Sequence, residues 1–180
     1  MPTSTSSSAA TGQDSAHPVP DDAIVIRPTS GTDGAHMWRL ARESGALDLN
    51  SSYAYLQLAQ DFGQSCRIAE RDGEALGFVL AYPPSARPGH LFVWQVAVSV
   101  AARGEGLAGR MIDDLLDDPA VEYLEATVTE DNAGSRALFA GIARRRAAEL
   151  VWIEHLRSED FPDAGHDAEP MLRIGPLGPR

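Results

Sequence analysis

Cysteine is almost absent from this sequence, with Cys66 the only one among 180 residues. A single thiol cannot form a disulfide within the chain, and cysteine-based zinc sites need several thiolates. The five histidines show no ligand spacing either, so we predict no metal site. We expect Cys66 to be a small buried apolar residue in a strand, the usual setting of a free cysteine.

Long apolar runs are absent as well, and no segment offers the ~20 apolar residues that a bilayer-spanning helix needs. Residues 1–22 contain no arginine and no apolar stretch, so they do not resemble a signal or transit peptide. We predict a disordered tail over residues 1–22, one folded domain over 23–175 and a short C-terminal tail over 176–180. The expected location is the cytoplasm.

Basic residues are scarce, since 15 Lys and Arg face 26 Asp and Glu and the formal net charge is -11. Non-specific nucleic-acid binding rests on Lys and Arg meeting phosphates, so we expect no nucleic-acid partner and no docking on anionic membranes. A small cationic substrate is compatible with this balance. Hydrophobic residues make up 43% of the chain, which permits a sizeable core.

Strands and helices are predicted to alternate along the chain. Thr32 or Asp33 is expected to cap a first helix, and Asn50 or Ser51 a second helix with Leu56, Ala59 and Phe62 facing inward. The Asp72-Gly73 pair is typical of a hairpin turn. Strands are expected at 24–28, 65–70, 75–82, 91–98, 123–128, 149–155 and 170–174, and helices from about 33 to 44, 51 to 62, 107 to 116 and 132 to 144.

This order, β-α-α-β-β-β-α-β-α-β with one further candidate strand, places the chain in the α/β (α+β) class. Hairpin-linked strands followed by a strand-helix-strand crossover imply a mixed, mostly antiparallel central sheet. Helices should cover both faces of that sheet, with the strand at 91–98 central. We find no internal repeat and therefore expect a single domain.

A glycine-rich loop, Arg103-Gly104-Glu105-Gly106-Leu107-Ala108, joins the apolar strand to a helix. Glycines let backbone N–H groups converge on a ligand, and the first turn of a helix adds unpaired N–H groups and a positive dipole end. This combination suits a pyrophosphate. Neither the Walker spacing nor the dinucleotide fingerprint is present. A flexible surface turn is the alternative for this hexapeptide taken alone.

In context, the chain resembles the GCN5-related N-acetyltransferase (GNAT) superfamily from about residue 24 to 155. Arg103, Gly106 and Ala108 match the family's pyrophosphate loop, and Asn132 and its followers match the next strand-helix unit. The resemblance implies acetyl-CoA as co-substrate and a GNAT fold. Its expected binding residues are Gln95, Val96, Val98, Arg103, Gly104, Glu105, Gly106, Leu107, Ala108, Asn132, Ser135 and Phe139.

Two points in this half of the chain stay open. Asn132 also suits a plain helix cap, and both roles are compatible. Phe139 stands where many GNAT enzymes have a tyrosine that protonates the departing CoA thiolate. Either another group supplies that proton, or the thiolate leaves without one, since a thiol pKa of about 8.5 makes it a fair leaving group.

Segments 47–56, 92–96, 124–129 and 166–170 look like the L-2,4-diaminobutyrate acetyltransferases of ectoine biosynthesis. This resemblance implies acetyl transfer from acetyl-CoA to the γ-amino group of L-2,4-diaminobutyrate, by direct attack of the neutral amine and without an acyl-enzyme. It also suggests a homodimer. Another small amine or a protein N-terminus is the alternative substrate, and a non-catalytic acetyl-CoA sensor is the alternative outside the enzymes.

The implied substrate carries two ammonium groups and one carboxylate. Asp48 and Glu169 suit the ammonium groups, His166 and Tyr53 could donate or relay protons, and Trp94 could wall the pocket. Asp48, Glu169 and His166 are the candidate bases, and the sequence does not choose among them. The competing interpretations are a helix cap for Asp48, plain core for Trp94, and solvated tail positions for His166 and Glu169.

Two charged runs are expected to be structural. Asp113, Asp114, Asp117 and Asp118 suit the solvated face and end of a helix. The run 144–146 consists of three arginines, which we expect to stabilise the C-terminal end of their own helix through its dipole.

Overall fold

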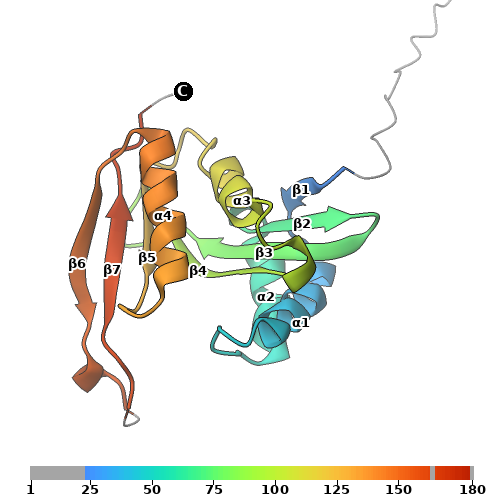
Figure 1. The fold of residues 1–180 in the computed structure, drawn as a ribbon, viewed down its shortest axis with the longest axis horizontal. Helices are drawn as coiled ribbons and strands as arrows, with labels where there is room; N and C mark the ends of the chain where they lie inside the picture. Colours follow the sequence, from blue (N-terminus) through green and yellow to red (C-terminus); the bar gives the residue numbers. More distant parts are fainter. Residues whose placement is uncertain (1–22, 163–164, 179–180) are drawn as a thin grey trace, which may run out of the picture.

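The computed structural model describes residues 23–162 and 165–178. The predicted tail over 1–22 lies outside the described residues, as do positions 179–180 of the predicted C-terminal tail. Within the described part, seven strands form a single sheet in the order β1-β2-β3-β4-β5-β7-β6. Figure 1 shows α4 packed on one half of this sheet and the α1–α2 pair packed on the other.

The order of elements predicted from the sequence is confirmed, including the final strand. The strands are β1 (Val25–Pro28), β2 (Arg67–Arg71), β3 (Glu74–Tyr82), β4 (His90–Val98), β5 (Tyr123–Thr127), β6 (Leu150–Leu156) and β7 (Glu169–Ile174). The helices are α1 (Gly34–Ser44), α2 (Ser52–Asp61), α3 (Leu107–Leu115) and α4 (Ala133–Arg146). One boundary is wrong: Gly63–Ser65 forms a 3-10 turn where a strand was expected to begin.

Antiparallel pairing joins β1 to β2, β2 to β3 and β3 to β4. The last two pairs link strands that are consecutive in the chain, as expected, whereas α1 and α2 separate β1 from β2. Asp72 and Gly73 both have positive φ, at 52° and 79°, in the tight turn between β2 and β3. That backbone conformation matches the twist of paired strands, which is why Asp-Gly signals a hairpin.

The pairing of β4 with β5 is parallel and short. Three residue pairs make up its register: His90–Tyr123, Leu91–Leu124 and Phe92–Glu125. Beyond Phe92 the two strands diverge, so one edge of β4 has no neighbouring strand among the described residues. The other edge of β5 pairs with β7, which lies between β5 and β6.

Two hydrophobic cores lie on opposite faces of the sheet and confirm that helices cover both. Met111 of α3 and Ile142 of α4 are fully buried in the first core, against Leu124 of β5. Met37 of α1 and Phe78 of β3 belong to the second core. Cys66 is fully buried there too, immediately before β2 rather than within a strand, and burial raises the pKa of its thiol.

Charged pairs on α3 and α4 correct the expectation of two independent solvated runs. Asp113 of α3 binds Arg145 at 2.7 Å and Arg146 at 3.1 Å, and Arg146 also binds Asp117. Asp114 pairs with Arg67. The arginines of α4 therefore bridge to a neighbouring helix, because α4 packs beside α3.

Thr32 or Asp33 was expected to cap α1. Asp33 occupies the N-cap position, but its side chain makes no capping hydrogen bond. Its carboxylate accepts hydrogen bonds from the Ser30 backbone N–H at 2.7 Å and from both terminal nitrogens of Arg27 at 2.9 Å. Burial opposes ionisation of Asp33, yet these bonds outweigh it and lower the carboxyl pKa to about 2. The pair thereby fixes β1 to the start of α1.

Candidate functional site

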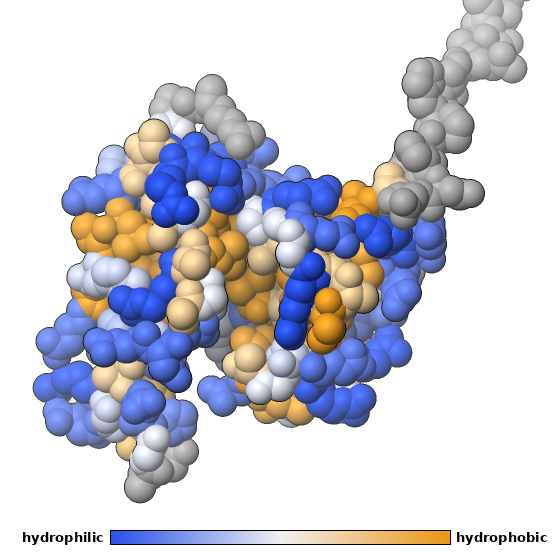
Figure 2. Space-filling view, in the orientation of Figure 1, coloured by the Kyte–Doolittle hydropathy of each residue, from blue (hydrophilic) through white to orange (hydrophobic). Residues whose placement is uncertain are grey.

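A cleft of about 310 Å³ opens where β4 and β5 have diverged. Figure 2 shows the surface hollowed between the part formed by α4, β6 and β7 and the part formed by α1 and α2. Six of the predicted cofactor residues line the cleft, which confirms that the fold brings them together. They are Val96, Val98, Arg103, Ala108, Asn132 and Ser135.

The glycine-rich loop enters α3 through two residues with positive φ, Gly104 at 87° and Gly106 at 69°. Glycine adopts such angles at no steric cost because it has no Cβ, and Gly106 is the N-cap of α3. Leu107 is buried and anchors the first helical turn in the core, whereas the Arg103 side chain is exposed at the cleft. Free N–H groups and a cation therefore face the same space, as an anion site requires.

Glu105 lies in the same loop but would not attract an anion. Its carboxylate instead pairs with Arg71 of the β2–β3 hairpin at 3.1 Å. The pair ties the loop to the sheet and offsets the negative charge beside the anion site. Glu105 is thus better placed to hold the loop than to contact phosphate.

The N-terminus of α4 forms the opposite wall of the cleft. The Asn132 side chain accepts a hydrogen bond from the Ser135 backbone N–H at 3.0 Å, which confirms that Asn132 caps the helix. Asn132 and Ser135 also line the cleft, so the cap position and the cleft position coincide. Two helix N-termini thus converge on one space, and both favour a negatively charged ligand.

Phe139 lies elsewhere. Its side chain is 2% exposed in the core under α4 and does not line the cleft. A packing role explains its position fully. Its contact with the cofactor, expected from the family pattern, stays a prediction.

A β-bulge at Trp94 reshapes the middle of β4. Leu80 pairs with Gln95 and Ala81 pairs with Val93, so Trp94 has no partner on β3. Its side chain is 43% exposed, which contradicts the plain-core interpretation. Bulges commonly re-aim side chains beside active sites. Here the bulge coincides with an exposed indole that does not itself line the cleft, so its contact with the substrate stays a prediction.

Gln95 follows the bulge, and its side chain points away from the cofactor walls. It is buried, accepts a hydrogen bond from the Tyr55 hydroxyl at 2.7 Å and donates one to the Asp48 carbonyl oxygen at 2.8 Å. The Gln95 side chain therefore does not line the cleft, and a contact of Gln95 with the cofactor stays a prediction. Asp48 does not cap α2, because Ser51 accepts the capping bond from Ala54.

Sequence reasoning missed Tyr55. The inward face of α2 was predicted through Leu56, which is 42% exposed, whereas Tyr55 is 1% exposed and packs edge-on against Phe78. The spacing of Tyr55 to the buried Ala59 is a four-residue helical repeat and could have identified it. Tyr53, the predicted donor, is 70% exposed.

The remaining predicted substrate residues come from the β6–β7 region. Glu169 is the first residue of β7 and pairs with Leu156 of β6. His166 stacks on Phe161, with ring centroids 4.4 Å apart and planes 9° apart. Neither residue lines the cleft, so their roles stay predictions. The Asp48 loop does reach it, because Leu47 is a lining residue.

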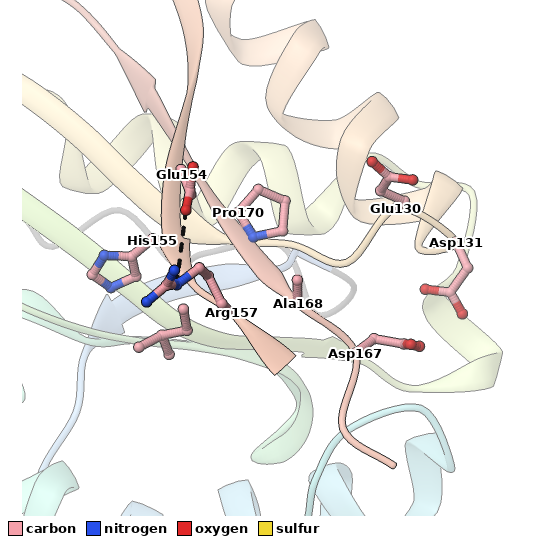
Figure 3. A pocket seen from close by; sticks show the side chains of 9 residues that line it. Glu130, Asp131, Glu154, His155, Arg157, Asp167, Ala168 and Pro170 are labelled. Carbon is pink, nitrogen blue, oxygen red and sulfur yellow. Dashed lines mark ion pairs between the residues drawn. The ribbon is translucent and has the colours of Figure 1, made fainter. Parts of the chain in front are cut away.

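A second cavity, of about 610 Å³, lies between the β5–α4 loop and the ends of β6 and β7 (Figure 3). Four carboxylates line it, together with Arg157, which faces Glu154 at 3.8 Å. This lining would repel the phosphates of CoA, so the smaller cleft is the better cofactor site. The carboxylates belong to Glu130, Asp131, Glu154 and Asp167.

A metal-binding cluster and a membrane-spanning helix are both absent from the described residues. Within 23–162 and 165–178, no group of three or more Cys, His, Asp or Glu side chains could hold a metal ion. In the same ranges, no helix combines the length and the apolar character needed to cross a membrane.

The splayed strands, the glycine loop and the paired helix N-termini define an acyl-CoA N-acyltransferase of the GNAT class. The Acetyltransferase (GNAT) family model matches residues 35–142. The L-2,4-diaminobutyric acid acetyltransferase of Marinococcus halophilus is 42% identical over 159 residues, covering 87% of this chain and 92% of the relative. The chain thus belongs to the GNAT acetyltransferases and, within them, to the L-2,4-diaminobutyric acid acetyltransferase family.

Solved structures agree with this assignment. The diaminobutyrate acetyltransferase from Paenibacillus lautus, in complex with its substrate L-2,4-diaminobutyric acid and coenzyme A, superposes with a TM-score of 0.82. It is 37% identical, with 88% of this chain and 98% of that chain covered. The Escherichia coli ribosomal-protein-S18-alanine N-acetyltransferase has a TM-score of 0.65 at 15% identity, with 87% and 95% coverage, and shares the fold.

Proposed function

We propose that the chain transfers the acetyl group of acetyl-CoA to the γ-amino group of L-2,4-diaminobutyrate, giving the acetylated precursor of ectoine. The observation that carries the proposal is the cleft at which β4, α3 and α4 gather six predicted cofactor residues. Family membership supplies the substrate, because the relatives named for this reaction match almost the whole chain.

Acetyl-CoA is expected to lie along the cleft with its pyrophosphate at the N-terminus of α3. There the backbone N–H groups after Gly106 and the Arg103 side chain offer donors and positive charge. The pantetheine arm would follow the unpaired edge of β4 near Val96 and Val98. That edge has free backbone groups because the β4–β5 ladder stops at Phe92.

The amine must be neutral to attack the thioester. With an amine pKa near 10, roughly one molecule in a thousand is neutral at pH 7, which corresponds to ~4 kcal/mol. Asp48, Glu169 and His166 are the candidate bases, acting directly or through water. A backbone N–H on the free edge of β4 can donate to the thioester oxygen as the tetrahedral intermediate forms. The nitrogen forms a bond to the acetyl carbon and gives one proton to the base, while the bond from that carbon to sulfur breaks and CoA leaves as the thiolate.

Charge favours this substrate over anionic ones. Diaminobutyrate is a net cation at neutral pH, and the chain has a formal net charge of -11. Asp48 is exposed on the loop that meets the cleft, next to the lining residue Leu47. Its carboxylate suits one ammonium group, and the exposed Trp94 indole suits the wall of the pocket.

A homodimer is part of the proposal. β6 is an edge strand, paired with β7 alone, and it exposes three large apolar side chains. Val151, Trp152 and Leu156 are 37%, 39% and 38% exposed. Unprotected apolar edges invite pairing with a second copy, and monomers usually block them with charge. Nucleic acid and membrane are not among the proposed partners, and the proposed compartment is the cytoplasm.

One assay tests the proposed enzymatic activity and its substrate. Purified protein with acetyl-CoA and a panel of amines should release free thiol fastest with diaminobutyrate, and mass spectrometry should place the acetyl group on the γ-nitrogen. If diaminopropionate, ornithine, spermidine or a peptide N-terminus reacts faster, that amine is the substrate and the diaminobutyrate proposal is wrong. No thiol release with any amine would leave the acetyl-CoA sensor instead.

A second measurement tests the oligomer. Light scattering after gel filtration should give twice the chain mass, and Val151→Lys with Leu156→Lys should shift it to the monomer. A monomeric wild-type protein would contradict the homodimer.

A further inference from the structure

We propose that Gln95 is a positioning residue for substrate recognition: it fixes the Asp48 loop against β4, so that the Asp48 carboxylate meets the substrate ammonium at a set place. The inference rests on the proposed function, in which Asp48 binds the amine. It assigns to the Gln95 side chain a role in the amine half of the site, although the next residue, Val96, belongs to the cofactor half.

The contacts leave the Gln95 amide one orientation. Its Oε1 accepts from the Tyr55 hydroxyl at 2.7 Å and its Nε2 donates to the Asp48 carbonyl at 2.8 Å. A flipped amide would set Oε1 against the Asp48 carbonyl oxygen, and two acceptors at that distance repel. The polar groups of the amide are thus matched, and Gln95 itself is only 6% exposed.

Tyr55 is held as firmly as Gln95. Its ring is 1% exposed and meets Phe78 edge-on at 6.3 Å, so its hydroxyl cannot move far from Gln95. Phe78 belongs to β3 and Gln95 to β4, which are paired strands. The chain of contacts therefore runs from the rigid centre of the sheet through α2 to the loop between α1 and α2.

Few other contacts hold this loop at Asp48. Leu47 packs partly against the second core, while Asp48 and Leu49 are exposed. The Asp48 side chain makes no hydrogen bond or ion pair within the described part of the chain, so its direction depends on its backbone. The bond to its carbonyl is the polar link between that backbone and β4.

The bulge makes this arrangement possible. Because Trp94 is the extra residue, Gln95 points to the α1–α2 face while Trp94 is turned outward beside it. One irregularity thus sets the position of the exposed indole and, through Gln95, that of Asp48. These are two of the side chains predicted to contact the substrate.

The test compares variants in KM and kcat. Gln95→Met removes both hydrogen bonds at similar volume, and Tyr55→Phe removes the hydroxyl alone should Gln95→Met fold poorly. We expect Gln95→Met to raise the KM for diaminobutyrate about tenfold, Tyr55→Phe to raise it less, and the KM for acetyl-CoA to stay within twofold. In an Asp48→Asn background, the same Gln95→Met change should alter the KM for diaminobutyrate by less than threefold.

Thr29→Val is the matched control, since it removes a buried hydrogen bond from a side chain to the Ala59 carbonyl of α2. It should leave both KM values unchanged. The inference would be overturned if Gln95→Met raised the KM for diaminobutyrate by the same factor in the wild-type and Asp48→Asn backgrounds. It would also be overturned if Gln95→Met raised the KM for acetyl-CoA as much as the KM for diaminobutyrate.

Hydrogen exchange tests the inference without substrate turnover. The backbone amides of residues 46–50 should exchange about tenfold faster in Gln95→Met than in the wild-type protein. In Thr29→Val their exchange rates should equal those of the wild type. Unchanged exchange in Gln95→Met would refute the positioning role even if the enzyme acetylates diaminobutyrate. If exchange is faster in Gln95→Met but the wild-type protein does not acetylate diaminobutyrate, the contact between Gln95 and the loop is supported and only the proposed function is refuted.

Discussion

Phe92 and Glu125 form the last residue pair of the β4–β5 ladder. Glu125 is fully buried, and it accepts hydrogen bonds from Arg87 at 2.9 Å and Arg173 at 2.8 Å. Burial alone would raise its carboxyl pKa, but these bonds and the nearby His90 lower it. The cleft therefore opens directly beyond the point where Glu125 of β5 binds the β3–β4 loop through Arg87 and β7 through Arg173.

Replacing Asp48 by asparagine should weaken substrate binding selectively. Hydrogen bonds to charged groups contribute about 1.5–3 kcal/mol, so we expect the KM for diaminobutyrate to rise roughly 10- to 100-fold. The KM for acetyl-CoA should hold, because the cleft residues are untouched. Steady-state kinetics with Asp61→Asn, an exposed carboxylate at the end of α2, provides the control. An unchanged KM in Asp48→Asn would remove Asp48 from the pocket.

Replacing Arg103 by alanine should weaken cofactor binding. Loss of one charge-assisted contact to pyrophosphate is expected to raise the KM for acetyl-CoA about tenfold, with a smaller effect at high salt. Acetyl-pantetheine lacks the pyrophosphate, so its turnover should not change. Arg39→Ala, an exposed arginine on α1, is the control. Equal losses with both acetyl donors would show that Arg103 acts elsewhere.

Gly34→Ala should destabilise the fold. A Cβ at this position would lie 2.5 Å from the Leu56 Cα, so α1 and α2 would have to move apart. We expect a loss of about 1–3 kcal/mol in the free energy of unfolding by urea. Gly141→Ala, within α4, should instead gain up to ~1 kcal/mol, because its Cβ would meet only the ends of two flexible arginine side chains, Arg144 and Arg145. Equal stabilities for the two variants would contradict the close helix packing.

Acid should unfold the protein partly through Asp33. Its folded pKa of about 2 lies below the ordinary aspartate value of 3.8, so its stabilisation is complete above about pH 4 and is lost as pH falls towards 2. This difference in pKa corresponds to about 2 kcal/mol in the free energy of unfolding contributed by this buried carboxylate. The stability gap between wild type and Asp33→Asn should therefore narrow over that range. Urea unfolding at several pH values measures it, and a constant gap would refute the assignment.

Local patterns predicted most of the fold correctly. The Asp72–Gly73 turn, the Ser51 cap and the glycine loop at Gly106 each depend on backbone conformations that near neighbours determine. The cofactor cleft followed from them, because β4, the loop and α4 are joined by one crossover. Six residues that line it were therefore predictable from the sequence alone.

Long-range pairing was beyond such patterns. No local signal shows that β7 lies between β5 and β6, since Leu150 and Leu124 meet Ile174 from opposite sides only in the folded sheet. The bulge at Trp94 is likewise a property of the β3–β4 register. Without it, Gln95 could not be seen to face Asp48. Arg146 was assigned to its own helix end because its partner Asp113 is 33 residues away.

Because the ladder stops at Phe92, the proposed binding of acetyl-CoA along β4 couples the stability of the folded protein to the concentration of acetyl-CoA. Acetyl-CoA would occupy the unpaired edge of β4 in the folded state and find no such edge in the unfolded chain. Binding then adds RT ln(1 + [L]/Kd) to the free energy of unfolding, about 2.7 kcal/mol when the ligand is at 100 times its Kd. Cells rich in acetyl-CoA would thus hold more of this protein folded, and starvation for acetyl-CoA would lower both its turnover and its lifetime.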